Sequence, residues 1–301
     1  MTVDELLREY NINLPSDAPG RYYTVCPQCS HTRKPGNQKL KCLGVTIGND
    51  RVGFGCNHCG WTGPSKGDGR ASRPSYAAQE PQPHEPDPAA LEIWRNAKPA
   101  AGTVVDSYLR NRRILLVPPS LRCGSTMHLG RYPMPTMVAA VQRPDGKVVA
   151  VQTTLLTHAG AKVPTGQPRR TVGALGDGAV RLAKATDVLG LAEGVEDALS
   201  AMQITGVPCW ACLGAGRMHR VAIPDHVREL NLFGDDDEAG RAALERTDAQ
   251  HRHRRRHLRY PPVGIKDWND FLRSRPAAQR VALADFPAIT DPMISWKDIA
   301  R

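Results

Sequence analysis

Three acidic groups between residues 188 and 270, each placed after a short apolar run, constrain the fold of this chain more than any other feature. The acidic residues are Glu193, Asp235, Asp237, Asp267 and Asp270. Carboxylates that follow buried parallel strands lie at the edge where an open α/β sheet places its ligand or metal site. Gathered there, they would bind Mg²⁺ through hard oxygen ligands. The alternative, that each group only caps a helix N-terminus, is harder to maintain for three groups at three strand ends.

Strand-like and helix-like segments alternate through the same region, and this alternation predicts a parallel α/β sheet. The expected strands cover residues 188–192, 207–213, 229–233 and 257–260. The expected helices cover residues 195–204, 218–223, 238–251 and 267–273. Asp235 and Asp237 would point the same way in an extended or turn conformation, so their carboxylates can share a metal ion. Cys209 and Cys212 lie inside the second strand, which favours buried core thiols over metal ligands or a redox pair.

Two CxxC pairs near the N-terminus predict a zinc ribbon. The cysteines are Cys26, Cys29, Cys56 and Cys59, with strand-like runs at 39–47 and 51–55 between the pairs. Two such pairs at strand ends suit tetrahedral thiolate coordination of one structural Zn²⁺. A module of this size is too small to fold on its core alone, so the metal would supply much of its stability. Cys42 is expected to be a buried strand thiol, and His31 and His58 are not needed as ligands.

The residues between the cysteines and the acidic region divide into a tether and a basic folded segment. Residues 64–88 are rich in Pro, Gly, Ser, Ala and Glu, a composition typical of a flexible linker. Helices are then expected at 90–97 and 104–113, and strands at 136–142 and 148–156. The loop that follows carries Lys162, Arg169 and Arg170 among glycines and prolines. Such a loop suits phosphate contact, and an ordinary solvated basic loop explains it equally well.

The charge of the chain suggests a polyanionic partner, although a basic balance alone is a weak indication of nucleic acid. The 301 residues carry a net charge of +10. The basic run from His251 to His257 ends an expected helix, where cations favour the helix dipole; a nucleic-acid face is the alternative. The first residues lack a signal-peptide pattern and no apolar run approaches ~20 residues, so we expect a cytoplasmic protein without a membrane partner.

The acidic region resembles a Toprim domain, the catalytic fold shared by DNA primases, topoisomerases and some nucleases. The resemblance rests on Glu193-Gly194, on Asp235-x-Asp237 followed by Ala239-Gly240, and on Lys266 to Leu272. The cysteine module is similar to the zinc ribbon of phage-type primases, and the segment from Tyr108 to Leu182 is similar to the basic subdomain that precedes Toprim in those enzymes. Ribbon, tether, basic subdomain and Toprim in this order resemble a bacterial or phage DNA primase without a helicase domain.

This resemblance implies an α/β multi-domain chain with a zinc ribbon, a basic α+β subdomain and a Rossmann-like catalytic domain built on a parallel sheet. The expected divisions are a zinc-ribbon template-binding domain at 1–63, a linker at 64–88, the basic subdomain at 89–186, Toprim at 187–275, and a C-terminal helix and tail at 276–301. The sequence has no GxxxxGK[ST] phosphate loop, so we expect a stand-alone primase, or the primase part of a larger enzyme, that works beside a separate replicative helicase.

The implied activity is the synthesis of short RNA primers on single-stranded DNA from ribonucleoside triphosphates, during phage, plasmid or bacterial replication. Glu193, Asp235, Asp237 and Asp267 would be catalytic, and Asp235, Asp237, Asp267 and Asp270 would hold Mg²⁺ or Mn²⁺. The basic residues expected to contact nucleotide or template are Lys162, Arg169, Arg170 and Lys266. The metal ions would activate a ribose 3′-hydroxyl and stabilise the pentavalent α-phosphate and the leaving pyrophosphate.

Other functions remain open on the sequence. A DNA-binding recombination mediator of the RecR type also joins a four-cysteine zinc module to Toprim, but there the two lie close together, whereas here about 130 residues separate Cys59 from Glu193. A Toprim nuclease would use the same acids to hydrolyse phosphodiesters, and it leaves the ribbon unexplained. A topoisomerase fits least, because the chain is too short for strand-passage domains. A degenerate primase kept for regulation or DNA binding also stays open.

Overall fold

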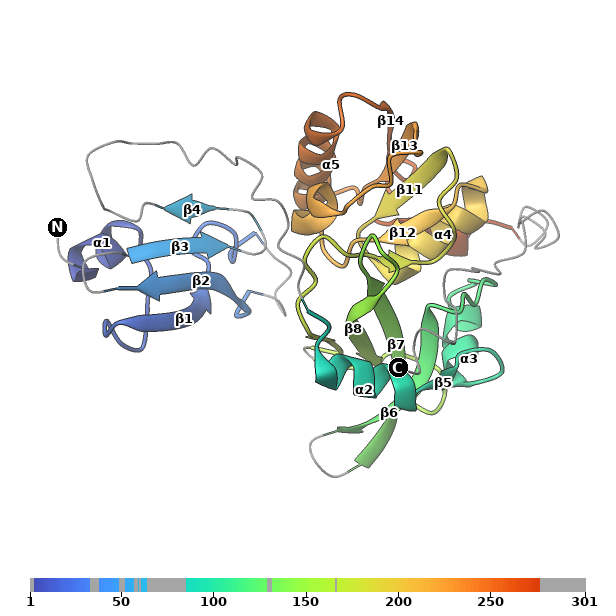
Figure 1. Ribbon diagram of the computed structural model, residues 1–301, viewed down its shortest axis with the longest axis horizontal. Helices are drawn as coiled ribbons and strands as arrows, with labels where there is room; N and C mark the ends of the chain where they lie inside the picture. The colour runs from blue at the N-terminus through green and yellow to red at the C-terminus, as the bar shows by residue number, and fades with distance from the viewer. Residues whose placement is uncertain are drawn as a thin grey trace. The chain divides into compact units, whose positions relative to one another are not determined.

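In the computed structural model the chain divides into two compact units, residues 1–79 and 80–301 (Figure 1). The structure describes residues 3–32, 38–48, 52–56, 59, 61–63, 85–128, 132–165 and 167–276. Most of the expected linker, His58, and the expected C-terminal tail beyond residue 276 lie outside these residues. In the described part of the chain, no helix is both long and apolar enough to cross a membrane.

The first unit is a four-stranded antiparallel sheet accompanied by one helix. Its elements are α1 (Val3–Glu9), β1 (Gly20–Val25), β2 (Lys41–Ile47), β3 (Val52–Cys56) and β4 (Thr62–Gly63), with the strands side by side in that order. Leu43, Val45 and Ile47 on β2 are buried and alternate with less buried neighbours, as a strand with one buried face requires. They pack in one cluster with α1, and the expected strands are confirmed.

The second unit begins with an antiparallel sheet in the order β5-β6-β7-β8-β9. The elements of this part are α2 (Pro88–Asn96), β5 (Lys98–Pro99), α3 (Val104–Asn111), β6 (Leu121–His128), β7 (Tyr132–Gln142), β8 (Val148–Leu155) and β9 (Arg169–Val172). Successive residues of a strand face opposite ways. Val138 and Ala140 on β7 therefore pack with Trp94 of α2, while Met137 and Ala139 face a core on the other side.

The rest of the second unit forms a mainly parallel sheet in the order β10-β12-β11-β13-β14. Its elements are β10 (Val180–Arg181), β11 (Val188–Ala192), α4 (Val195–Thr205), β12 (Cys209–Ala211), the 3-10 helix η2 (Ala215–Arg220), β13 (Glu229–Phe233), α5 (Glu238–Gln250), β14 (Arg255–Arg259) and α6 (Trp268–Ser274). The neighbouring pairs among β12, β11, β13 and β14 are parallel, and only β10 is antiparallel to its neighbour β12. The predicted parallel sheet is confirmed.

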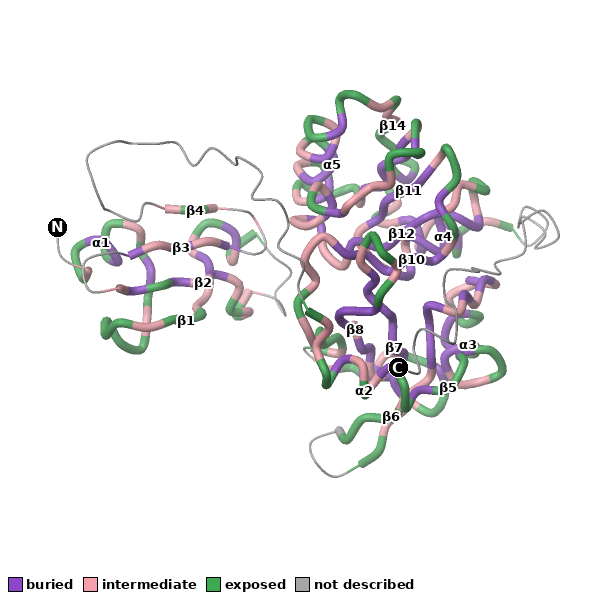
Figure 2. Tube along the Cα trace, viewed as in Figure 1, coloured by how far each residue is buried: buried purple, intermediate pink, exposed green. Residues whose placement is uncertain are grey.

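One hydrophobic core joins the two sheets of the second unit (Figure 2). It takes Tyr108 and Met137 from the antiparallel sheet and its helix α3, and Leu199, Phe233 and Trp268 from the parallel sheet and its helices. A second cluster lies on the opposite face of the parallel sheet, beneath η2 and α5. A parallel sheet needs both faces covered, and these two clusters cover them.

The two cysteines of the third CxxC pair are core thiols, as predicted. Cys209 and Cys212 are both fully buried. Cys209 packs in the core between the sheets, and Cys212 packs in the cluster on the other face. Neither thiol belongs to a compact group of metal-binding side chains among the described residues.

Several segments differ from the sequence expectation, among them β6 and β10, which were not predicted. The strand expected at 207–213 shortens to β12, because Leu213 and Gly214 adopt positive φ angles of 60° and 141°. The helix expected at 218–223 is the 3-10 helix η2, which begins three residues earlier. The basic loop contains β9, whose Val172 packs against the α2 side of the sheet. A single half-buried valine after two arginines is too short a pattern to predict a strand.

Candidate active site and zinc site

The carboxyl ends of β11 and β13 bring Glu193 and Asp235 to the same edge of the parallel sheet. Ala192 and Phe233 pair across the two strands, and the acidic residues follow them by one and two positions. Gly240 lets the first turn of α5 approach this edge, because a Cβ at that position would clash with the backbone of Asp235. The local sequence therefore places a helix N-terminus directly against the acidic residues.

Asp237 and Asp267 each cap a helix and keep one carboxylate oxygen outside the cap. Oδ1 of Asp237 accepts a hydrogen bond from the Gly240 N–H at 2.8 Å at the start of α5. Oδ1 of Asp267 accepts one from the Asp270 N–H at 2.7 Å at the start of α6. Helix capping is therefore present at both positions, as the alternative interpretation expected, but it uses only half of each carboxylate.

Burial and mutual repulsion raise the pKa values of the carboxyl groups at this edge. Burial raises the pKa of Asp235 to about 7, and Glu193, Asp267 and Asp237 add to the shift. Burial also raises the pKa of Glu193, with Asp197 and Asp237 contributing. Oδ1 of Asp235 is buried and has no hydrogen-bond partner among the described residues. A cation would remove the cost of these unsatisfied, mutually repelling groups.

Asp197 belongs to the same edge, although the sequence analysis did not single it out. Burial raises its pKa to about 8, with Asp235 and Asp267 adding to the shift. Its Oδ1 accepts a hydrogen bond from the Asn269 N–H at 3.2 Å, which links α4 to α6. It lies in the first turn of α4, four residues after Glu193, and this position did not distinguish it in the sequence. Asp270, by contrast, lies 3.3 Å from Arg273, with which it forms an ion pair.

The donor set at this edge fits a hard divalent cation. Its side chains are carboxylates, and Mg²⁺ and Mn²⁺ prefer oxygen ligands. Within the described residues, no three carboxylate oxygens lie as close together as the cysteine sulfurs, which are all within 4.8 Å of one another. Mg²⁺ usually keeps several waters and binds through one or two carboxylates. Asp235 and its nearest neighbours would hold such an ion, with the other acids adding negative charge.

The raised pKa values predict how the stability of the metal-free protein depends on pH. The folded state holds the protons of Asp235 and Asp197 up to about pH 7 and 8, whereas an unfolded aspartate has a pKa of 3.8. The free energy of unfolding should therefore fall by several kcal/mol as pH rises from below the unfolded value through the folded ones, since each unit of pKa shift corresponds to about 1.4 kcal/mol. Urea denaturation without metal should show this fall, and saturating Mg²⁺ should reverse it.

Asp197→Asn provides the control for this prediction. It removes one of the repelling carboxylates, so the slope of stability against pH should become shallower in the metal-free protein. An unchanged slope in this variant would show that the acidic edge is not the source of the pH dependence.

Beside the carboxylates, Glu196 accepts contacts from three donors. Nζ of Lys162 lies 2.7 Å from Oε1, Nη2 of Arg169 lies 2.8 Å from Oε2, and the Tyr108 hydroxyl donates to Oε1 at 2.6 Å. Burial alone would raise the pKa of Glu196, but Arg169 and Lys162 outweigh it and hold that pKa well below its usual range. The Glu196 side chain is only 3% exposed, whereas Arg169 remains 42% exposed. Glu196 therefore fixes two cations next to Asp197 while one of them still faces solvent.

The other two predicted basic residues lie in different surroundings. On β9, Arg169 pairs with Thr154 and Arg170 with Thr153, so the two arginines face opposite sides of the sheet. Arg170 is on the α2 side, away from Glu196. Nζ of Lys266 lies 3.8 Å from Oδ2 of Asp267, at the acidic edge. The structure thus brings Lys162, Arg169 and Lys266 to the carboxylate edge but not Arg170, while Glu196 and Tyr108 were not singled out from the sequence.

The cysteines of both CxxC pairs meet in the first unit. Sγ of Cys26 lies 3.8 Å from Sγ of Cys59, and Sγ of Cys29 lies 3.7 Å from Sγ of Cys56. These separations match the ~3.8 Å edge of a tetrahedron built from Zn–S bonds of ~2.3 Å, so the four thiols fit one structural Zn²⁺. Cys42 is half-buried rather than buried, and its Sγ lies 3.6 Å from that of Cys56.

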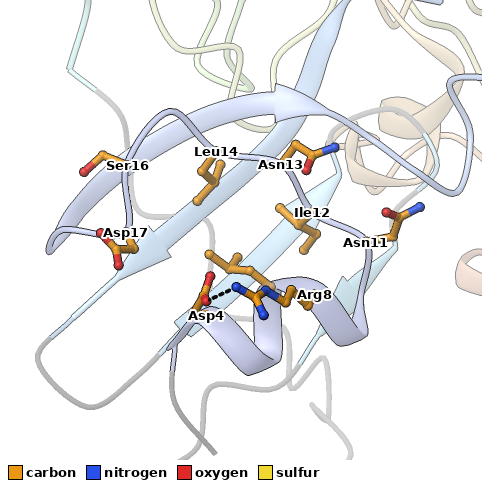
Figure 3. A pocket seen from close by; sticks show the side chains of 9 residues that line it. Asp4, Arg8, Asn11, Ile12, Asn13, Leu14, Ser16 and Asp17 are labelled. Carbon is orange, nitrogen blue, oxygen red and sulfur yellow. Dashed lines mark ion pairs between the residues drawn. The ribbon is translucent and has the colours of Figure 1, made fainter.

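The first unit also contains a hollow of about 400 Å³ beside α1 (Figure 3). Polar side chains dominate its lining, including Asn11, Asn13 and Asp17, and an ion pair of 2.7 Å joins Arg8 to Asp4 at its edge. None of the residues predicted for catalysis or metal binding lines it. The hollow therefore plays no part in the candidate site.

A parallel sheet with a carboxylate edge beneath helix N-termini places this part of the chain in the Rossmann-like class of α/β domains. Residues 188–278 match the family described as Toprim domain, so the chain contains a Toprim domain, as the acidic pattern predicted. Residues 84–182, which include the antiparallel sheet, match a family described as a domain of unknown function, DUF7146. No curated protein matches the chain.

The solved structures that match this chain include three primases. The primase fragment of the bacteriophage T7 primase-helicase protein has 16% identity and a TM-score of 0.42, with 83% of this chain and 92% of that chain covered. A DNA primase domain from Pseudomonas aeruginosa has 16% identity and a TM-score of 0.41, with 62% and 73% covered. The zinc-binding and RNA polymerase domains of the Aquifex aeolicus primase have 13% identity and a TM-score of 0.40, with 91% and 80% covered.

Proposed function

We propose that this chain is a DNA primase, a nucleotidyltransferase that joins ribonucleotides on a single-stranded DNA template. The observation that carries the proposal is the position of Lys162 and Arg169. Both form ion pairs with Glu196, which precedes Asp197 in α4. The positive charge of Arg169 also opposes the rise in the pKa of Glu193. Two fixed cations next to a carboxylate edge suit a nucleoside triphosphate, which needs positive side chains for its phosphates and a divalent cation to share them.

The reaction we propose joins a ribose 3′-oxygen to the α-phosphorus of an incoming triphosphate, and pyrophosphate leaves. A Mg²⁺ or Mn²⁺ ion, when bound, would supply charge stabilisation at the phosphate and lower the pKa of the hydroxyl. Asp235, Asp237 and Asp267 would hold the ion. Lys162 and Arg169 would contact phosphate oxygens and orient the triphosphate, with Arg169 the more accessible of the two.

The remaining parts of the proposal concern the setting of the reaction. The four-cysteine module would bind the template, the parts of the chain would follow the expected divisions at 63, 88, 186 and 275, and a separate replicative helicase would supply single-stranded DNA. Arg170 and Lys266 are proposed to contact the template or the nucleotide. Asp270 is proposed as a further metal-binding residue, and it would have to leave its contact with Arg273 to reach an ion. The enzyme would work in the cytoplasm of a bacterial or phage-infected cell.

A single assay tests the proposed function. The zinc-loaded chain is incubated with single-stranded templates, Mg²⁺ or Mn²⁺ and labelled ribonucleoside triphosphates, and products are separated by length. Template-dependent oligoribonucleotides support a primase. Degradation of the DNA without synthesis would mean a nuclease, and tight DNA binding with neither activity would mean a mediator or a degenerate primase.

Loss of one zinc ligand should impair the choice of template while leaving the catalytic residues intact. We expect Cys59→Ser to weaken Zn²⁺ binding by at least ~10²-fold, because one of four thiolates is lost and metal binding supplies much of the folding free energy of so small a module. Zinc per chain, measured with a chromophoric chelator, should fall, and priming on natural templates should weaken. Cys42→Ser is the matched control, and it should retain zinc because its sulfur lies outside the four-cysteine group. Unchanged template preference in Cys59→Ser would contradict the role of the module as the template-binding part.

A further inference from the structure

Strand β14 carries a row of basic side chains on one of its faces. It lies at one edge of the parallel sheet, beside β13. Successive residues of a strand face opposite ways, so Arg255, His257 and Arg259 share a face, and we call these three the basic row. It is the sheet face of Phe233, which pairs with Arg259. Two members of the row belong to the basic run from His251 to His257, which the proposed reaction leaves without a role.

The basic row is open to solvent, in contrast to the other face of β14. Helix α5 packs against that other face, where Arg256 pairs with Asp248 at 2.6 Å. On the open face, the side chain of Arg255 is 76% exposed and that of His257 is 37% exposed. Arg259 is exposed as well. A ligand can therefore reach all three side chains without any movement of the fold.

The neighbouring strand β13 does not fully neutralise the positive charge of the basic row. The carboxylate of Glu229 lies 3.5 Å from Nη1 of Arg255 and 3.3 Å from Nε2 of His257. Nε of Arg259 donates to the neutral Oδ1 of Asn231 at 3.0 Å, and no carboxylate of the described residues forms an ion pair with Arg259. One carboxylate for two arginines leaves a net positive charge, and such a surplus on an exposed surface attracts a polyanion.

The basic row leads to the acidic edge. The carbonyl oxygen of Arg259 accepts a hydrogen bond from the Gly234 N–H at 3.0 Å, and Asp235 follows Gly234. Arg255 lies four residues earlier in the strand, which is about 13 Å at ~3.3 Å per residue. Alternate residues are then about 6.6 Å apart, close to the distance between successive phosphates of an extended nucleic-acid strand. A strand that lay on the row would therefore pass to the carboxylates.

We propose that the basic row binds the sugar-phosphate backbone of the single-stranded DNA that passes over the acidic edge. Arg255 and Arg259 would each donate charge-assisted hydrogen bonds to a phosphate, with His257 between them. Such contacts fix the position of a strand and carry no sequence information. An acidic protein segment would also meet opposite charge here, but the spacing of the row and its direction towards the carboxylates favour nucleic acid. The inference rests on the proposed function for the identity of the strand, and it adds a surface that the proposed reaction does not use.

Fluorescence anisotropy of a labelled single-stranded DNA, titrated with the zinc-loaded full chain at several salt concentrations and without Mg²⁺ or nucleotides, tests the basic row. We expect the double variant Arg255→Gln with Arg259→Gln to bind at least ~10-fold more weakly at low salt. The slope of log affinity against log salt should become shallower by about 1.4, because each phosphate contact on a single strand contributes about 0.7. Lysine at both positions keeps the charge and should restore most of the affinity and of the slope. If the double variant does not fold, the single variant Arg255→Gln should show about half of the change in slope.

A second double variant, Arg95→Gln with Lys98→Gln, is the matched control. It removes two exposed charges from α2 and β5, and it should leave DNA binding almost unchanged. Glu229→Gln should strengthen DNA binding, because it removes the carboxylate that contacts Arg255.

Equal affinity and equal salt slope in the wild type and in the double variant of the row would overturn the proposal, and so would an equal loss in the control variant. Polyglutamate, titrated in the same way, represents the other occupant. Weaker binding of polyglutamate by the double variant with unchanged DNA binding would assign the row to an acidic protein and would also overturn the proposal. Because no measurement here uses nucleotides or metal-dependent synthesis, failure of the priming assay would leave the result standing.

Discussion

Asp235→Asn should reduce metal-dependent primer synthesis at least ~10³-fold while leaving the protein folded. The substitution keeps the size of the side chain but removes the charge of the residue at the centre of the acidic edge. Loss of several kcal/mol of charge stabilisation in the transition state corresponds to a rate loss of this size. Initial rates of dinucleotide synthesis under saturating ribonucleotide would measure it. In the metal-free protein, the same change should raise the melting temperature above pH 7, since it removes a buried and repelled carboxylate.

The neighbouring residue Asp236 provides the control. Its side chain is 41% exposed and pairs with Arg241 at 2.9 Å, so it points away from the acidic edge. Asp236→Asn removes the same charge one residue away, and synthesis should stay within ~3-fold of the wild-type rate, since exposed ion pairs contribute little. Equal losses in the two variants would mean that overall charge, rather than a metal site, controls the activity.

Glu196→Gln should lower both the stability of the second unit and its affinity for nucleotide. The variant leaves Lys162 and Arg169 without the carboxylate that they share, and breaking a buried ion pair costs about 3–5 kcal/mol. The partial exposure of both cations reduces this, so we expect about 2 kcal/mol in urea denaturation at neutral pH. The KM for ribonucleoside triphosphate should rise more than kcat falls, because the cations lose their fixed position while the acidic edge stays intact.

The loss of stability in Glu196→Gln should depend on pH. The folded-state pKa of Glu196 lies below the ordinary value of 4.5, so its stabilisation is present above that value and is lost as pH falls through the folded pKa. The stability difference between wild type and Glu196→Gln should therefore be full at neutral pH and shrink in acid. Tyr108→Phe, which removes only the hydroxyl that donates to Glu196, should cost about 1 kcal/mol and change KM little. A KM shift as large in Tyr108→Phe would contradict the role given to the two cations.

The strands that carry the acidic edge could be predicted closely from the sequence. Residues 188–192 form a continuous apolar run, and residues 229–233 carry three large apolar side chains beside Glu229 and Asn231. Each segment is followed by Gly or acidic residues, and a buried parallel strand is rich in such apolar side chains. The acidic edge could be predicted as well, because the carboxyl ends of parallel strands lie at the same edge of a sheet. The same argument could not find Asp197, which lies in helix α4, where the polar residues Glu196 and Ser200 are buried. A mostly buried helix has no polar face that would mark one acid as special.

The contacts of Glu196 could not be predicted for a different reason. Lys162 and Arg169 come from the antiparallel sheet, and Tyr108 comes from α3, which is 88 residues away in sequence. Only the packing of one sheet against the other brings them to α4. The sequence showed a basic loop and an acidic helix start, and both fit solvent exposure equally well. The burial of Glu196 under three donors is a property of the tertiary structure alone.

The common core of the two sheets determines how the chain can be divided by experiment. This core contains Tyr108 and Met137 from α3 and the antiparallel sheet, and Phe233 and Trp268 from the parallel sheet and α6. All four side chains are buried in the same hydrophobic cluster. A fragment that carried only residues 188–278 would present the inner face of α4 to water, and exposed apolar surface of that kind promotes aggregation. We therefore expect that residues 188–278 do not fold stably on their own. The smallest stable fragment that contains them should begin before α2, so that the antiparallel sheet and the carboxylates fold together.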